Sequence, residues 1–139
     1  MRVMPPDLIT WLMGYVSEAA DDDGFEVDVV GAEPEDLELP LPRPLIVIRI
    51  DPGSRVDWTT FDRSVGASVL GGSKNAPTPI VDLARWLASV LFDDELPLAT
   101  GSPIARVDFS GCNGPYAVPD ELDVARQYMT AQYVVEGSW

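Results

Sequence analysis

The side chains that could carry out chemistry in this sequence are almost all carboxylates. The chain of 139 residues has 23 Asp plus Glu, one cysteine and no histidine. Ser-His-Asp and Cys-His catalysis both need an imidazole, and the common zinc sites need several His or Cys ligands, so one copy of the chain can build neither. Two carboxylates could act as acid and base only if a pocket held them with separated pKa values. We therefore expect no enzyme activity and no cofactor.

Two acidic runs and two glycine-rich segments are the remaining candidates for ion or phosphate binding. Residues 21–23 and 93–95 offer oxygen ligands but lack the alternating spacing and distal Glu of a calcium-binding EF-hand loop. Segments 71–74 (GGSK) and 111–114 (GCNG) lack the GxxxxGK[ST] phosphate-binding pattern. We interpret both segments as turns and expect no metal. Cys112 has no basic neighbour and is interpreted as an inert thiol.

The charge balance is strongly acidic. Nine Lys plus Arg against 23 Asp plus Glu give a formal net charge of -14. Clustered cations are needed to neutralise DNA phosphates or to bind anionic membranes, and no such cluster is present, so we expect neither partner. The charge fits either an acidic wall past which DNA slides or simply a soluble acidic protein. No signal-peptide pattern or long apolar run is present, which predicts a soluble protein made in the cytoplasm.

Hydrophobic periodicity predicts two helices and five strands. Apolar residues recur at helical spacing in two segments, and Thr78 is the expected N-cap of the second. The segment LIVIRI at 45–50 is almost continuously apolar, as is typical of a central strand. In chain order the predicted elements are helix 6–20, strands 25–29, 45–50 and 61–71, helix 79–92, and strands 104–109 and 125–135.

This order predicts a single α+β domain over residues 1–139. We expect a mixed, mostly antiparallel sheet of about five strands, with the two main helices packed mainly on one face, in the order α-β-β-β-α-β-β. Strands that follow each other directly should pair antiparallel, whereas the crossover through helix 79–92 could place a strand parallel to an earlier one.

Three further segments are candidates for contacts with partners. Residues 31–44 hold four prolines and four acidic residues, and are predicted to form an extended arm that docks on another chain or lies on its own domain; its apolar residues are Leu37, Leu39 and Leu41. Residues 101–125 form either a long hairpin connection that presents Tyr116 or a structural loop. Trp139 follows Gly137 and Ser138 and is either a partner anchor or a frayed group.

The segment 84–135, ARWLASVLFDDELPLATGSPIARVDFSGCNGPYAVPDELDVARQYMTAQYVV, resembles the C-terminal half of tail terminator proteins of long-tailed actinobacteriophages. The resemblance spans about residues 79–135, and more weakly the strand layout of 25–70. Its most distinctive stretches are SGCNGP at 110–115 and DELDVAR at 120–126. The resemblance implies an α+β subunit that forms a hexameric ring on the finished tail tube, stops tube growth and receives the head connector. The implied partners are further copies of the chain, the tail tube protein and a head-closure or connector protein. The implied location is the tail-neck junction of the virion, after assembly in the host cytoplasm.

Electrostatic repulsion opposes the assembly of a ring from subunits this acidic. Six subunits that each carry a charge of -14 repel one another, so the interface needs buried apolar contact or local charge pairing. We expect the scarce arginines at subunit contacts, namely Arg43, Arg49, Arg55, Arg63, Arg106 and Arg126. Two other interpretations remain open. The chain could be another neck component such as a head-closure protein, or an acidic regulatory binder such as a DNA mimic.

Overall fold

The computed structural model describes residues 1–139 and contains the seven predicted elements and one additional strand. The fold is α+β with a mixed, mostly antiparallel sheet, which confirms the predicted class. In chain order the helices and strands are α1 (Leu8–Asp22), β1 (Asp28–Val30), β2 (Leu45–Asp51), β3 (Thr60–Gly71), α2 (Thr78–Leu91), β4 (Ile104–Val107), β5 (Asn113–Ala117) and β6 (Ala125–Glu136). Two short 3₁₀ helices cover Leu96–Leu98 and Phe109–Gly111.

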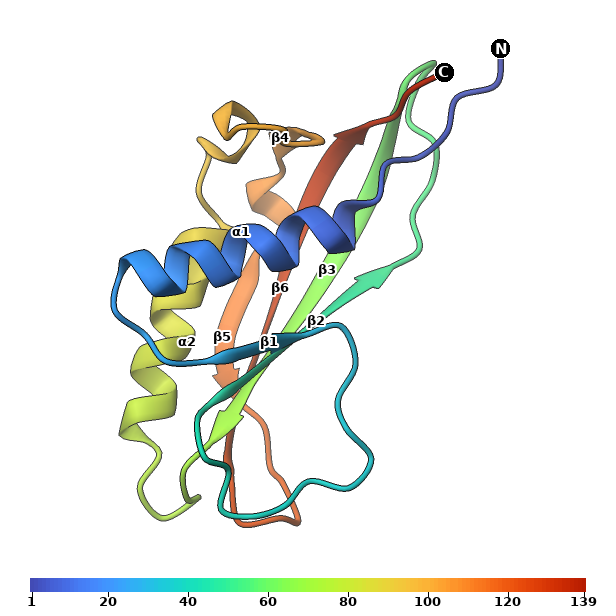
Figure 1. The fold of residues 1–139 in the computed structure, drawn as a ribbon. Helices are drawn as coiled ribbons and strands as arrows, with labels where there is room; N and C mark the ends of the chain where they lie inside the picture. Colours follow the sequence, from blue (N-terminus) through green and yellow to red (C-terminus); the bar gives the residue numbers. More distant parts are fainter.

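The strands lie in the order β1-β2-β3-β6-β4, and β5 also pairs with β6 (Figure 1). β4 pairs with the C-terminal part of β6 and β5 with its N-terminal part, so the two form one interrupted edge strand. The 3₁₀ helix Phe109–Gly111 lies between them. The sequence analysis missed β5 because its segment, NGPYA, contains Gly and Pro, which are depleted in strands.

The crossover through α2 places the following strand β4 parallel to β3, as the sequence allowed, but the two are not neighbours because β6 lies between them. The parallel pair is β1 and β2, which are joined by the 31–44 arm rather than by a helix. β3 and β6, the long strands on either side of α2 in sequence, pair antiparallel. β4 and β5 also pair antiparallel with β6, so both run in the same direction as β3.

Both helices begin close to the predicted positions. Asp7 caps α1, where its carboxylate accepts hydrogen bonds from the Thr10 amide at 3.3 Å and the Thr10 hydroxyl at 2.8 Å. Thr78 is not the N-cap of α2, because the helix already includes it and Pro77 precedes it as the cap without a side-chain hydrogen bond. Neither helix combines the length and the apolar character needed to cross a bilayer.

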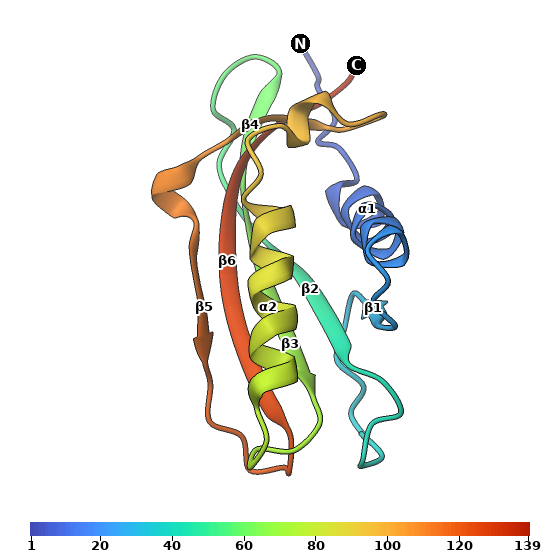
Figure 2. The same cartoon turned by 90° about the vertical axis from the view of Figure 1, so that its left-hand side faces the viewer.

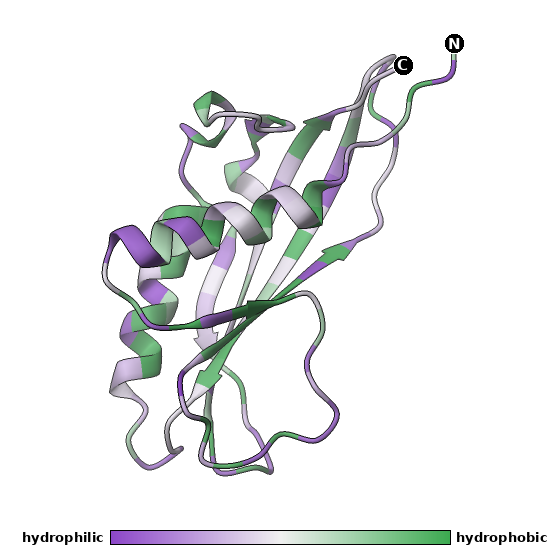
Figure 3. Cartoon of the chain, viewed as in Figure 1, coloured by the Kyte–Doolittle hydropathy of each residue, from purple (hydrophilic) through white to green (hydrophobic).

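The core lies between the helices and one face of the sheet. Figure 2 shows α2 in front of the long strands β3 and β6, with α1 beside β1 and β2. Apolar and hydrophilic residues alternate along β3 and β6, as expected for strands with one covered face (Figure 3). The largest fully buried side chains are Leu12, Val16, Ile46, Ile48, Val65, Leu70, Ile80, Leu87, Leu91, Leu96, Met129 and Tyr133. The Tyr133 hydroxyl donates a 2.6 Å hydrogen bond to the carbonyl of Leu91, the last residue of α2. Burial raises the pKa of Tyr133.

Candidate functional site

The sheet face opposite the helices carries no helix and is polar except at one end, where Leu45 and Leu70 form part of a small buried cluster. It is formed by alternate residues of β2, β3 and β6, including Arg49, Asp51, Ser64, Gly66, Ser68, Arg126, Tyr128, Thr130 and Gln132. These residues occupy register rows that alternate with the rows of the core, because successive side chains of a strand point to opposite faces. We call this surface the open face.

One side-chain bridge crosses the middle of the open face. Arg49 donates hydrogen bonds to the Tyr128 hydroxyl at 2.9 Å and to the Asp51 carboxylate at 3.0 Å. The hydrogen bond to Asp51 is the main cause of the raised pKa of Arg49. Gly66 lies beneath this bridge, where a β-carbon would come within 2.3 Å of the Tyr128 hydroxyl oxygen. The bridge therefore depends on glycine at this position of β3.

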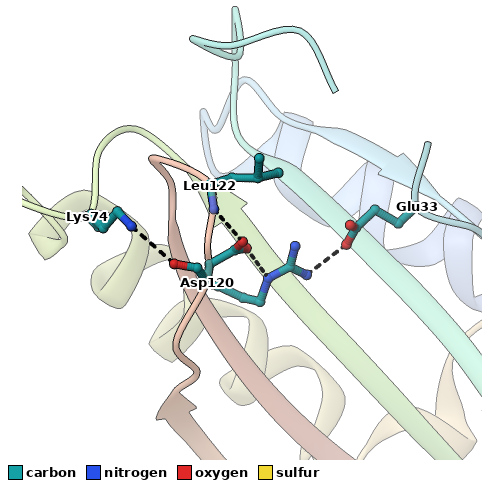
Figure 4. A network of polar contacts seen from close by, with 5 residues as sticks. Glu33, Lys74, Asp120 and Leu122 are labelled. Atoms are coloured by element: carbon teal, nitrogen blue, oxygen red, sulfur yellow. Dashed lines mark hydrogen bonds and ion pairs between the residues drawn. The ribbon is translucent and has the colours of Figure 1, made fainter. Parts of the chain in front are cut away.

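Arg126 joins three segments at one end of the open face (Figure 4). Its guanidinium donates to Glu33 of the arm at 2.7 Å and to Asp120 at 2.8 Å. Asp120 also accepts from the Leu122 amide at 3.0 Å, and its backbone carbonyl accepts from Lys74 at 3.1 Å. The Leu122 amide and the Arg126 guanidinium lower the pKa of Asp120, while Glu33 is the leading cause of the raised pKa of Arg126.

The 31–44 arm lies on its own domain. Leu37 and Leu41 pack against a small buried cluster formed by Leu45, Leu70 and Val124. Leu39 remains 37 % exposed. With Glu33 held by Arg126, the arm is attached at several points and does not extend away from the subunit.

A groove runs along the open face beside the arm. Two adjoining hollows of about 730 and 410 Å³ share Glu33, Ser68, Arg126 and Tyr128 as walls. The larger is also lined by Tyr116, Val118, Pro119, Asp120, Glu121 and Leu122. Tyr116 meets Tyr128 edge to face, with ring centroids 5.8 Å apart, and stays 47 % exposed. Aromatic and proline walls beside carboxylates make this groove suited to a side chain that is both apolar and cationic.

The opposite end of the sheet carries a cluster of exposed apolar side chains, which we call the aromatic pole. Its members are Met1, Met4, Val56, Trp58 and Trp139. Both chain termini and the β2–β3 loop lie at this end in Figures 1 and 2. Paired hydrogen bonds connect Met4 with Ser138, and the Gly137 amide donates to the Thr59 carbonyl at 2.8 Å. The pole is therefore one continuous surface built from three segments.

The loop that carries Trp58 is held in a single conformation by hydrogen bonds. The Asp57 carboxylate accepts from the amides of Thr59 and Thr60 at 3.0 and 3.1 Å, which lowers the pKa of Asp57. Arg55 donates to the carbonyls of Asp57 and Trp58. The Trp58 side chain nevertheless remains 75 % exposed. An ordered loop thus presents a large aromatic ring to solvent.

A scan against protein-family models and a search of curated proteins both found no match for this chain.

The structure distributes the predicted arginines over several surfaces instead of one interface. Arg55 and Arg63 lie in and next to the Trp58 loop, where Arg63 donates to the Asp62 carbonyl at 2.7 Å and lies 5.3 Å from the Phe61 ring centroid. Arg49 and Arg126 lie on the open face. Arg43 lies within the arm, 3.8 Å from Asp28, and Arg106 lies exposed on β4. The predicted interface role of these arginines stays a prediction.

Sequence reasoning missed the main members of the aromatic pole. It selected Trp139, but not Trp58, Val56, Met1 or Met4. The sequence did contain a sign of this surface in the turn-rich segment 51–59 (DPGSRVDWT). A tryptophan in a polar turn is expected to remain exposed, because the turn does not pack into the core. No group of three His, Cys, Asp or Glu is placed to hold a metal ion. Cys112 is partly buried, with its sulfur 3.4 Å from the Asp108 carbonyl oxygen.

Proposed function

We propose that this chain is a structural subunit of the neck of a long-tailed phage, acting as its tail terminator. In this role six copies form a ring on the finished tail tube, stop its elongation and connect the tail to the head-closure or connector protein. The subunit performs no catalytic step and uses no cofactor. It resides at the tail-neck junction of the virion after assembly in the host cytoplasm.

The observation that carries the proposal is the aromatic pole. Trp58 and Trp139 are 75 % and 79 % exposed, although neighbouring hydrogen bonds order the segments that carry them. Exposed apolar groups of this size mark surfaces that bind another protein, and tryptophan is enriched among the residues that dominate binding energy. The resemblance of residues 79–135 to tail terminators is the reason for proposing a six-copy ring on the tail tube as the assembly.

The charge of the chain supports a channel role for the ring. A net charge of -14 per subunit disfavours tight contact with DNA phosphates. An acidic lumen would therefore let DNA pass without binding it. The same charge also favours the alternative of an acidic regulatory binder, which should remain monomeric or dimeric and bind a basic protein.

Particle mass in solution tests the proposal. Light scattering and native mass spectrometry over a range of protein and salt concentrations should reveal a closed six-copy species, and electron microscopy should show it as a ring. Salt should promote assembly because it screens repulsion between the acidic subunits. A chain that stays monomeric under all conditions, and also when preformed tail tubes are supplied, would contradict the proposal.

A tube-elongation assay separates the terminator from another neck component. Purified tail tube protein is allowed to polymerise with and without this chain. A terminator should bind to one end of the tubes and fix their length. A head-closure protein should leave elongation unchanged and bind the connector ring instead.

A further inference from the structure

The aromatic pole has the properties of an interface anchor that is organised before binding. Arg55 and Asp57 hold the loop through hydrogen bonds to its own backbone, so docking Trp58 would cost little ordering entropy. Gly53 keeps the loop close to β3, because a β-carbon there would collide with the Asp62 carbonyl oxygen. A flexible loop could fold its tryptophan against the domain, whereas this one holds Trp58 outward.

The groove on the open face matches that anchor in size and chemistry. Its larger hollow of about 730 Å³ is shallow and open to solvent, and it is wide enough to receive an indole ring. Tyr116 and Pro119 offer flat apolar walls for an aromatic ring, and Leu122 at the rim is 43 % exposed. The groove is open to solvent within one subunit, so a side chain of another molecule can enter it.

The charges of the two surfaces are complementary. The groove wall includes Glu121, which has no ion pair within the chain, and the adjacent arm adds Glu35, Asp36 and Glu38. At the pole, Arg2 lies beside Trp139 and likewise has no ion pair within the chain. In a chain with only nine Lys and Arg, Arg2 beside Trp139 adds a free cation to the pole, which favours contact with an acidic surface.

The two surfaces lie at opposite ends of the same strands. β3 begins at Thr60, next to the Trp58 loop, and ends at Gly71, beyond the groove residue Ser68. Its 12 residues span about 40 Å, so Trp58 cannot reach the groove of its own subunit. A contact between unlike ends of two copies is heterologous and produces either a closed ring or an open filament.

We propose that the aromatic pole of one copy docks into the open-face groove of a second copy, with Trp58 between Tyr116 and Pro119, so that subunits join head to tail. This inference rests on the proposed function in that it names the contact from which a ring would be built. It also explains how a chain of this charge can assemble, because the contact pairs an acidic surface with exposed aromatic groups and Arg2.

Photo-crosslinking tests the contact even when assembly is weak. The photoreactive amino acid p-benzoylphenylalanine in place of Val56, which is half exposed beside Trp58, leaves the anchor itself intact. An isotope-labelled copy mixed with an unlabelled one identifies crosslinks between subunits by mass spectrometry. Crosslinks from position 56 to residues 116–128 of the other copy are expected. Crosslinks only to other regions, or none at any concentration, would overturn the inference.

Mixing two defective variants tests the head-to-tail arrangement. Trp58→Ala should weaken self-association at least about tenfold, and Leu122→Lys should do the same by placing a bulky cation in the groove. A one-to-one mixture should recover a dimer and nothing larger, because only one intact pole then meets one intact groove. Leu98→Ala and Leu98→Lys are the matched controls, since Leu98 is 82 % exposed and lines neither the groove nor the hollows at the pole, and they should assemble normally.

The outcomes separate this inference from the proposed function. Six-copy rings that persist in Trp58→Ala and in Leu122→Lys would reject the docking contact while leaving the terminator proposal standing. Crosslinks between pole and groove in a chain that grows only into filaments would support the contact and reject the ring. Circular dichroism confirms first that each variant is folded.

Discussion

Arg126 donates a 2.7 Å hydrogen bond to the carboxylate of Glu33, although 93 positions separate the two residues in the sequence. The same guanidinium holds Asp120, so one side chain ties the arm and the segment before β6 to the sheet. Arg126 is only 15 % exposed at its side chain, and its ion pairs are therefore less screened than surface pairs. The arm owes its fixed position to this residue together with Leu37 and Leu41.

Arg126→Ala should release the arm. The substitution leaves the carboxylates of Glu33 and Asp120 without their cation, and we expect a loss of about 1–3 kcal/mol in the free energy of unfolding. Urea denaturation measures the loss, and hydrogen exchange should become faster in residues 33–42. The exposed pair Arg85–Asp82, at 3.8 Å, provides the control, because Arg85→Ala should cost less than about 0.5 kcal/mol. Equal effects of the two substitutions would contradict this account of Arg126.

Asp120 should contribute to stability in a pH-dependent way. Its pKa is lowered in the folded chain, first by the Leu122 amide and then by Arg126. A lowered pKa gives stability that is present above the unfolded value of about 3.9 and is lost as pH falls through the folded value. Asp120→Asn should therefore lower stability at pH 7 but have a shrinking effect below about pH 4. Comparing it with Asp94→Asn at each pH removes the general effect of neutralising an acidic protein.

The elements of this fold could be predicted because their patterns are local. Leu83, Leu87 and Leu91 recur at helical spacing, and all three are buried on α2. The run 45–50 is a central strand with β1 and β3 on either side. In both cases the apolar residues that define the pattern also form the core. The pattern therefore predicts both the element and the residues that it buries.

The missed features depend on contacts that are distant in sequence. β5 forms from a segment with poor strand propensity because the edge of β6 supplies hydrogen-bond partners for it. The parallel pairing of β1 with β2 depends on the path of the arm, which has no periodic pattern of its own. Tyr116 was selected as a candidate and lies in the groove, but only the paired register shows that Tyr128 and Arg126 lie beside it.

The Arg49–Tyr128 bridge should make Gly66 difficult to replace. Gly66→Ala would place a β-carbon 2.3 Å from the Tyr128 hydroxyl oxygen, and we expect a cost of about 1–3 kcal/mol from the forced movement. Tyr128→Phe removes that oxygen, so the double variant should lose less stability than the sum of the two single variants. A double-mutant cycle from thermal or urea unfolding measures this coupling. Strict additivity would show that Tyr128 does not restrict position 66.

Leu87 tests whether α2 anchors the core. It is fully buried, and Leu87→Ala should cost about 2–5 kcal/mol through the loss of apolar contact and the cavity left behind. Leu98→Ala is the matched exposed control and should cost less than about 0.5 kcal/mol. Urea unfolding at one fixed pH gives both values. A cost below about 1 kcal/mol at Leu87 would contradict the packing of α2 on the sheet.

Tyr133 should stabilise the fold at neutral pH and weaken it in strong alkali. Tyr133→Phe removes the hydrogen bond to the Leu91 carbonyl, which has no helical partner at the end of α2, and should cost about 1–2 kcal/mol at pH 7. Burial raises the pKa of Tyr133 in the folded chain, so its contribution is complete below the unfolded value of about 10 and falls as pH rises above it.

Urea unfolding between pH 7 and 11 measures the difference in the free energy of unfolding between the wild-type chain and Tyr133→Phe. The difference should be constant up to about pH 9 and then narrow, because only the wild-type unfolded chain gains an ionised tyrosine at this position. Tyr15→Phe provides the comparison at a partly exposed tyrosine, which stacks on Trp11. A constant difference for Tyr133→Phe up to pH 11 would mean that the buried hydroxyl ionises as easily in the folded chain as in the unfolded one.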